Sequence, residues 1–292
     1  MNEQSCIRAI QDVYPDFIVH SLVRNEIGQN NDVWIVNGAY VFRFPKYALG
    51  IRQLKKETAV LQAVQDSVSL PIPAPVYRSF VPEEPGKVFT GYPLLRGEPF
   101  TREAFAQAAR HNQLPAIAAQ LGRFLHELHS FPYEQRLPEL VSDSVGMADE
   151  LTELYDRIVS RLFPAMRESA KQEIAERFET YLADPAHFAF APRLIHGDFG
   201  TTNILYDAQK QRITGIIDFG GAGIGDAAYD FAGLAASYGE NFLSCLSPWY
   251  PDLDSVLVRM RFYRSTFALQ EALFGIEQGD EQAYRAGMRD YV

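Results

Sequence analysis

The segment spanning residues 196–220 constrains the fold more than any other part of the chain. It reads HGDFGTTNILYDAQKQRITGIIDFG, in which two apolar runs flank a polar turn. Such a pattern predicts a β-hairpin. Asn203 precedes the first run and Asp218 follows the second, so we expect the hairpin to bring these two side chains together at its open end. Asp198 lies five residues before Asn203, in the loop that leads into the hairpin.

These three polar residues have the chemistry that phosphoryl transfer requires. A carboxylate must be aimed at the attacking hydroxyl, and oxygen ligands must hold the magnesium that bridges the phosphates. Asp198 and Asn203 can place their side-chain oxygens at the same end of one loop. Asp218, at the end of an apolar strand, supplies another hard ligand for the ion. An isolated HGD would predict nothing, because Asp often caps turns. The spacing of all three indicates a kinase-type site.

The motifs HGDxxxxN and IDFG resemble the signature of the aminoglycoside phosphotransferase family, which is related to the protein kinases. Gly197 stands where protein kinases usually carry Arg. The segments FRFPK, LGRFLHELHSF and GDAAYD also resemble this family, in the same order, so the resemblance covers roughly residues 15–290. FRFPK and EALFGIEQGD look nearest to the aminoglycoside 2″-phosphotransferases. The resemblance implies transfer of the γ-phosphate of ATP or GTP to a hydroxyl, with Mg²⁺.

The resemblance also implies roles for individual residues. Asp198 matches the catalytic aspartate, and Asn203 and Asp218 match the magnesium ligands. The nucleotide would be bound by a basic residue on the third strand, its acidic partner on the next helix, a hinge running from Tyr92 to Arg96 and a phosphate-covering loop with one glycine. The residues at these positions are Arg43, Glu57, Tyr92, Leu94, Arg96 and Gly28.

Arg43 departs from the usual kinase pattern, in which the third strand carries Lys. Strand alternation puts Arg43 on the same face as Val41, whereas Lys46 lies beyond Pro45 and is no obvious substitute. Arg keeps the positive charge and can donate two hydrogen bonds to phosphate oxygens, although Arg and Lys are not interchangeable. Arg43 is also the one feature that favours a binding module without catalytic activity, a pseudokinase.

Five other polar residues have structural interpretations. We expect His196 to brace the loop through hydrogen bonds rather than to move protons. Asp226 and Asp230 are expected to cap or tether the following helix. His126 and His129, on the predicted helix 114–131, are expected to be surface or packing residues.

The acceptor site is predicted on the C-terminal helices. Glu271 and Phe274 are three residues apart and share a helical face, so they could offer a carboxylate to an ammonium and a ring to a sugar. Glu240 and Glu277 could add charge, giving an acidic shelf. An ordinary solvated helix edge explains each of these residues equally well.

The coarse pattern predicts a bilobal, kinase-like α+β fold. A β-rich lobe over residues 1–95 would bind nucleotide, and a helical lobe over residues 96–292 would carry catalysis and the acceptor. Strands are expected at 17–23, 76–81 and 87–93, with a hairpin turning at Asn37-Gly38. Helices are expected at 50–65, 114–131 and, as one or two helices, over 148–183; the lobes would join within residues 91–99.

The composition limits the classes of molecule that the chain is expected to bind. The net charge of −10 argues against nucleic acid or an anionic membrane and mildly favours a cationic small-molecule acceptor. The chain has only two cysteines, no basic segment followed by an apolar leader, and no long apolar run. We therefore expect a cytoplasmic protein. We also expect it to be a monomer.

Other functions remain open at this level. A kinase of the same fold could act on a macrolide, a sugar, choline, homoserine or a glycated amine. Protein-kinase activity is disfavoured, because the chain lacks HRD and an APE-like segment after IDFG. Tyr92, as a bulky residue at the back of the nucleotide pocket, could disfavour adenine and shift the preference toward guanine.

Overall fold

The computed structural model describes residues 1–25, 30–142 and 146–292, so Gly28 lies outside the described residues. Its N-terminal part is built on a five-stranded antiparallel sheet in the order β1-β2-β3-β5-β4. The strands are β1 (Leu22–Asn25), β2 (Asn31–Val36), β3 (Tyr40–Pro45), β4 (Tyr77–Ser79) and β5 (Phe89–Pro93). Asn37 and Gly38 both have positive φ, 56° and 60°, as the predicted hairpin turn requires.

The first predicted strand is largely wrong. Regular pairing begins only at Leu22, because Phe17 packs edge-on against the rings of Tyr40 and Phe42, with centroids 5.6 and 5.5 Å away, instead of joining the sheet. A helix that we did not predict, α1 (Glu3–Val13), precedes it. The side chain of Asn2 caps α1 by accepting from the Ser5 N–H at 2.9 Å.

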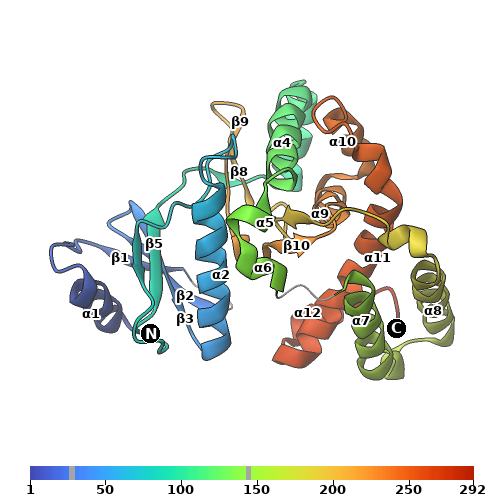
Figure 1. The fold of residues 1–292 in the computed structure, drawn as a ribbon, viewed down its shortest axis with the longest axis horizontal. Coiled ribbons are helices and arrows are strands. Elements are labelled where there is room, and N and C mark those ends of the chain that lie inside the picture. The colour runs from blue at the N-terminus through green and yellow to red at the C-terminus, as the bar shows by residue number, and fades with distance from the viewer. Residues whose placement is uncertain (26–29, 143–145) are drawn as a thin grey trace.

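Two helices cover opposite faces of this sheet (Figure 1). The inner face of α1 packs with the aromatic side chains that strands β2, β3 and β5 turn toward it; this cluster contains Cys6, Ile10, Trp34, Phe42, Phe44 and Phe89. On the other face lies α2 (Ala48–Val64), close to the range expected. Because adjacent strand residues point to opposite faces, Phe44 faces α1 and Arg43 faces α2.

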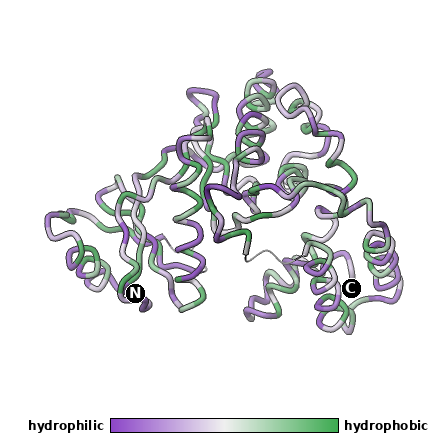
Figure 2. The backbone as a smooth tube through the Cα atoms, viewed as in Figure 1, coloured by the Kyte–Doolittle hydropathy of each residue, from purple (hydrophilic) through white to green (hydrophobic). Residues whose placement is uncertain are grey.

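The C-terminal part is mainly helical and surrounds two small sheets (Figure 1). Its helices include α3 (Arg102–Arg110), α4 (Leu114–His129), α5 (Tyr133–Arg136), α6 (Pro138–Ser142), α7 (Met147–Arg161), α8 (Glu168–Ala183), α9 (Ala228–Tyr238), α10 (Glu240–Leu243), α11 (Leu253–Gln278) and α12 (Glu281–Met288), with short 3-10 turns between some of them. Figure 2 shows the alternation of hydrophilic and hydrophobic residues along the peripheral helices, typical of amphipathic helices that pack on one core.

The two small sheets carry the motif segments. One sheet, in the order β6-β8-β9, contains β6 (Glu98–Pro99), β8 (Ile204–Asp207) and β9 (Arg212–Ile216), and β8 with β9 forms the hairpin predicted from the sequence. The other pairs β7 (Arg193–Ile195) with β10 (Gly223–Gly225). Thus a small antiparallel sheet lobe precedes a larger helical lobe, and the bilobal kinase-like fold is confirmed. Among the described helices, not one has a stretch long and apolar enough to cross a bilayer.

Candidate active site

Asp198 and Asn203 are joined directly across the loop between β7 and β8. The Asn203 Nδ2 group donates to Asp198 Oδ2 at 2.8 Å and to the Asp198 backbone carbonyl at 2.9 Å. Water reaches the Asp198 side chain, yet protein atoms surround much of it, and this partial desolvation raises the pKa of its carboxyl despite the hydrogen bond from Asn203. Asp198 is therefore a positioned carboxylate of raised basicity.

The hairpin holds Asp218 beside Asn203. Ile204 is paired with Ile216, and the Ile217 N–H donates to the Asn203 carbonyl at 2.9 Å, so both polar residues lie at the open end of the hairpin. Asp218 adopts a left-handed conformation with φ 62°, which turns the chain out of β9. Its side chain is 52% exposed, whereas the Asn203 residue is 5% exposed. The sequence prediction that the hairpin joins these residues at one end is confirmed.

Arg43 connects the two lobes at this point. Its Nη1 contacts Glu57 Oε1 of α2, and its Nη2 lies 3.3 Å from Asp218 Oδ1. Burial works against the guanidinium charge, but Glu57, Tyr92 and Asp218 together outweigh it and raise the pKa of Arg43. The structure thus brings together the basic and acidic residues that the resemblance paired.

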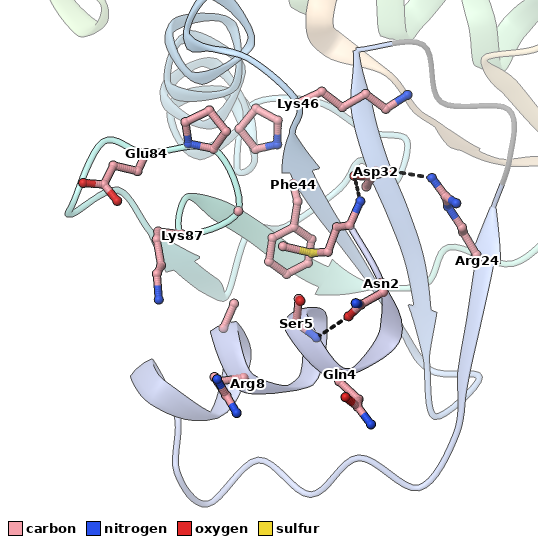
Figure 3. A pocket seen from close by; sticks show the side chains of 15 residues that line it. Asn2, Gln4, Ser5, Arg8, Arg24, Asp32, Phe44, Lys46, Glu84 and Lys87 are labelled. Atoms are coloured by element: carbon pink, nitrogen blue, oxygen red, sulfur yellow. Dashed lines mark hydrogen bonds and ion pairs between the residues drawn. The ribbon is translucent and has the colours of Figure 1, made fainter.

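A large cavity lies away from these residues. A hollow of about 820 Å³ opens between α1, the strands β2 and β3 and the loop around Glu84. Figure 3 shows Phe44 and Lys46 on its wall, and Asp32 pairing with Arg24 at 2.7 Å. Because this is the sheet face opposite Arg43, Lys46 lies on the other side of the sheet from Glu57, which agrees with the expectation that Lys46 does not replace the usual Lys.

The segment expected to form the hinge leaves the sheet at the end of β5. Tyr92 pairs with Val41 in the sheet and is 9% exposed, and burial raises its pKa to about 12. The Leu94 N–H donates to the Ala39 carbonyl at 2.8 Å, so this amide is not free to bind a nucleotide base. The groups of the segment from Tyr92 to Arg96 that could bind a base are its carbonyls and the amides nearer Arg96.

The loop that carries Asp198 is held in place by α9. Asp230 accepts hydrogen bonds from the backbone N–H groups of His196 and Gly197, each at 2.8 Å, and is fully buried. Asp230 lies inside α9 and ties this helix to the loop, which agrees with the tether that the sequence predicted as one of two roles. Asp226 precedes the N-cap residue Ala227 and accepts from the Ala228 N–H at 3.0 Å at the start of the helix. No local pattern in the sequence shows which residues Asp230 is tethered to, because these partners are more than thirty residues away.

His196 braces the loop as expected. Its Nε2 is 3.0 Å from the Ile217 carbonyl, and its Nδ1 accepts from the Asp198 N–H at 3.2 Å. His129 is a buried packing residue with a polar role as well, because its Nε2 is 3.0 Å from Asp230. His126 is exposed on α4.

A second cavity adjoins the loop that carries Asp198, on the helical lobe, and extends to α2. Its volume is about 430 Å³, and Gly197 and Gly221 form part of its wall. The remaining lining residues are Lys56, Leu140, Met147, Glu150, Leu151, Leu154, Arg157, Ile195, Gly223, Ile224, Gly225, Asp226, Tyr229, Tyr263 and Gln270. We refer to it as the α7–α11 cavity. The negative charge of Asp198 acts on Tyr229 in its wall.

The expected acceptor residues do not line this cavity. Glu240 pairs with Arg261, whose Nε lies 2.9 Å from Glu240 Oε1, and that hydrogen bond lowers the pKa of Glu240. Glu277 pairs with Arg157 at 2.8 Å. Glu271 is exposed and Phe274 half-buried on α11, beside Gln270, which does reach the cavity. The acidic shelf is therefore partly neutralised by arginines.

The kinase-like fold and the loop geometry define a phosphotransferase. Residues 21–257 match the profile of the phosphotransferase enzyme family (APH), and the chain belongs to this family. It is a small-molecule kinase by family and fold.

Individual relatives refine this picture. Viomycin phosphotransferase of Streptomyces vinaceus is 32% identical over 181 residues, which are 60% of this chain and 61% of that protein. The GDP complex of aminoglycoside 2′-phosphotransferase-IIIa superposes with a TM-score of 0.87 at 28% identity, over 99% of this chain and 97% of the other. A GDP and kanamycin complex of APH(2″)-IIIa gives 0.86 at 28% identity, over 97% and 95%.

Proposed function

We propose that the chain transfers the γ-phosphoryl group of ATP or GTP, with Mg²⁺, to a hydroxyl of an aminoglycoside-like cationic polyol. The observation that carries this proposal is the direct hydrogen bond between Asp198 and Asn203, beside Asp218 at the open end of one hairpin. Residues 1–95 would form the nucleotide lobe and residues 96–292 the catalytic and acceptor lobe.

The reaction would depend mainly on alignment. Asp198 accepts a hydrogen bond from the acceptor hydroxyl and takes its proton late, as the oxygen forms a bond to the γ-phosphorus and the bond to the nucleoside diphosphate breaks. The raised pKa of Asp198 makes it a better proton acceptor than a solvated aspartate. Arg43, fixed by Glu57, faces the position where phosphate charge would lie.

The residues at the open end of the hairpin fit a magnesium ion. Asn203 and Asp218 offer an amide oxygen and a carboxylate, which are hard ligands of the kind that Mg²⁺ prefers, with phosphate oxygens completing the set. The bound ion would neutralise charge on the phosphates. Arg43 now lies against Asp218, so nucleotide binding would draw Arg43 toward the phosphates and release Asp218.

The acceptor would occupy the α7–α11 cavity. Its volume falls in the range of small-molecule sites, and it reaches Gly197, the residue before Asp198. Viomycin and aminoglycosides are the substrates named for the relatives that are 28% or more identical, which supports a cationic antibiotic as the acceptor; two macrolide phosphotransferases share the fold at 18% identity. The GDP complexes among the similar structures support a nucleotide pocket that accepts guanine, whereas two neighbours at 20% identity contain ADP or ATP; buried Tyr92 is the residue that would set this preference.

A coupled nucleotide-consumption assay tests the proposal. We expect kanamycin-dependent turnover by the wild type and a loss of about 10³-fold or more in Asp198→Ala, since an alignment residue and a proton acceptor disappear together. The melting temperature serves as the control for folding. Turnover with a macrolide but not with kanamycin would reject the acceptor class. Nucleotide-dependent thermal stabilisation without turnover on any acceptor would support the pseudokinase instead.

A further inference from the structure

A buried tyrosine lies behind the tether that holds the loop carrying Asp198. The Tyr250 hydroxyl is 3.0 Å from His129 Nδ1, and the second ring nitrogen of His129, Nε2, is 3.0 Å from Asp230 Oδ2. Asp230 Oδ1 accepts from the Gly197 N–H at 2.8 Å. A continuous series of hydrogen bonds thus connects Tyr250, which precedes α11, to the residue before Asp198.

The three side chains of this network, Tyr250, His129 and Asp230, are buried, with 6, 2 and 0% of each residue exposed. They come from three separate parts of the helical lobe: the segment before α11, the end of α4, and α9. The Tyr250 ring also lies edge-on to the His129 ring and to Phe231 of α9, with centroids 5.6 and 4.7 Å away. Because buried polar groups are costly without partners, such a network fixes the relative positions of the segments that form it.

The direction of each hydrogen bond follows from the chemistry of the three groups. Burial would raise the pKa of Asp230, but the interactions with His129 and the loop amides outweigh burial and lower it, so the carboxylate is ionised and only accepts. His129 therefore carries a hydrogen on Nε2. Burial raises the pKa of Tyr250, so its hydroxyl keeps its proton, and among the described residues its hydrogen-bond partner is His129 Nδ1 alone. A hydroxyl can donate to a bare Nδ1 or accept from a protonated one, so Tyr250 holds the Nε2–H toward Asp230 in either charge state of the ring.

The helix that carries His129 also holds the hairpin of the proposed magnesium ligands. Gln120 of α4 accepts from the Ile213 N–H at 3.0 Å and donates to the Ile213 carbonyl at 3.3 Å. Ile213 belongs to β9, the outer strand of its sheet and the strand that leads to Asp218. One helix therefore contacts both parts of the candidate site, and His129 is its link to the loop.

We propose that His129 and Tyr250 are positioning residues for phosphoryl transfer: Tyr250 holds the His129 ring so that its Nε2–H fixes the Asp230 carboxylate, and with it the loop that carries Asp198. This inference rests on the proposed role of Asp198 in catalysis. Neither side chain needs to touch a substrate, so their loss should lower kcat and leave the KM values nearly unchanged.

The test compares Tyr250→Phe with Tyr238→Phe. Tyr238 is also buried, and its hydroxyl donates to the Phe100 carbonyl at 2.7 Å, so each variant loses one buried hydrogen bond, but only Tyr250 belongs to the network. With kanamycin as acceptor, we expect Tyr250→Phe to lower kcat about tenfold, because a small displacement of the loop misaligns Asp198. The KM values for kanamycin and nucleotide should stay within about twofold. Tyr238→Phe should lower the melting temperature to a similar extent and keep its kcat, and an equal kcat in the two variants would overturn the inference.

Two substitutions of His129 separate positioning from packing. His129→Gln can place an amide N–H where Nε2 lies and so keep the hydrogen bond to Asp230, whereas the shorter His129→Asn can reach only the Tyr250 hydroxyl. We expect His129→Gln to retain kcat within about threefold, and His129→Asn to lose at least as much as Tyr250→Phe. Equal losses in the two variants would leave His129 a packing role alone and would contradict the proposal.

Hydrogen exchange at the Gly197 amide measures the same connection without turnover. The Gly197 N–H should exchange about tenfold faster in Tyr250→Phe than in Tyr238→Phe, since the tether to Asp230 opens more often. A wild type that does not phosphorylate kanamycin would reject the acceptor class of the proposed function, and this comparison would then decide the inference. Faster exchange in Tyr250→Phe supports the positioning role, and equal exchange rates overturn it.

Discussion

Asp230 holds the backbone of Gly197 through a hydrogen bond of 2.8 Å from the Gly197 N–H to Asp230 Oδ1. The other carboxylate oxygen accepts from the His196 N–H and approaches His129. A buried side chain of α9 thus fixes the two residues that precede Asp198. The position of the Asp198 carboxylate, the proposed catalytic group, depends on this tether as well as on the hairpin.

Asp230→Asn should destabilise the protein by roughly 2–4 kcal/mol. The amide that replaces one carboxylate oxygen would face a backbone N–H, and a buried charged hydrogen-bond network would be broken. Urea unfolding measures the effect. Asp156→Asn, at an exposed position of α7, is the control and should change stability by less than about 0.5 kcal/mol.

The stabilisation by Asp230 should also depend on pH. Burial would raise its pKa, but the hydrogen bond and charge of His129 and the loop amides outweigh burial, and the pKa of Asp230 is lowered. A carboxyl whose pKa is lower in the folded state stabilises fully above its unfolded pKa of about 3.9 and loses that contribution as pH falls through the folded pKa. The stability difference between wild type and Asp230→Asn should therefore be constant from pH 5 to 7 and shrink below about pH 4. A difference that grows on acidification would contradict this sign.

Arg43→Lys should weaken nucleotide binding. The two terminal nitrogens of Arg43 reach Glu57 and Asp218 separately, and a lysine has a single nitrogen with which to do so. We expect the KM for the magnesium–nucleotide complex to rise about tenfold, measured at saturating acceptor. Lys46→Met, on the opposite sheet face, is the matched control and should leave this KM within about twofold. An unaffected KM in Arg43→Lys would remove the basis for a phosphate role.

Gly197→Ala should impair turnover more than the backbone strain of a positive φ alone would. Gly197 has φ 79°, and an added Cβ would lie 2.2 Å from the Gly221 carbonyl oxygen. Gly239 has a similar φ of 87° with no atom within 4 Å of such a Cβ, so Gly239→Ala tests the backbone strain without the clash. We expect Gly239→Ala to cost about 1 kcal/mol of stability and to keep its activity. Gly197→Ala should cost more stability and at least about 100-fold in turnover, because the loop must shift by fractions of an ångström at Asp198.

The carboxyl of Asp198 should titrate above the ordinary range for aspartate in the nucleotide-free protein. Its raised pKa means that the proton is retained at higher pH, so the basic form is lost as pH falls through that raised value. Carbon-13 NMR of labelled aspartate, with Asp198→Asn to assign the resonance, measures this. Asn203→Ala should raise the value further, because the hydrogen bond from Asn203 favours the charged form. A normal value in both proteins would contradict the expectation.

The hairpin and the loop chemistry could be predicted from the sequence because their causes are local. The Asn37-Gly38 turn follows from positive φ, and the β8–β9 pair follows from two apolar runs around a polar turn. The range of α2 followed from helical periodicity, and the pairing of Glu57 with Arg43 followed from the resemblance, whereas the burial of Glu57 was not predicted. The helix α1 could have been found, since Asn2 is a good N-cap and Cys6, Ala9 and Ile10 have helical spacing.

The long-range partners could not be predicted. Glu277 is 120 residues from Arg157, and Glu240 is 21 residues from Arg261, so the sequence could not show that these carboxylates are already paired. The same holds for the tether from Asp230, and for the meeting of α7 and α11 around one cavity. Surface carboxylates on helices look alike in sequence whether or not an arginine from another helix lies beside them.

The turn of the β8–β9 hairpin lies at the end opposite to Asn203 and Asp218. The chain can therefore be lengthened between Asp207 and Arg212 without altering the spacing of the two proposed magnesium ligands. A single-residue deletion inside β9 would instead reverse which way each later side chain points, and would carry Asp218 away from its partner. Among descendants of this enzyme, insertions and deletions should be tolerated at the tip of the hairpin and selected against in its strands.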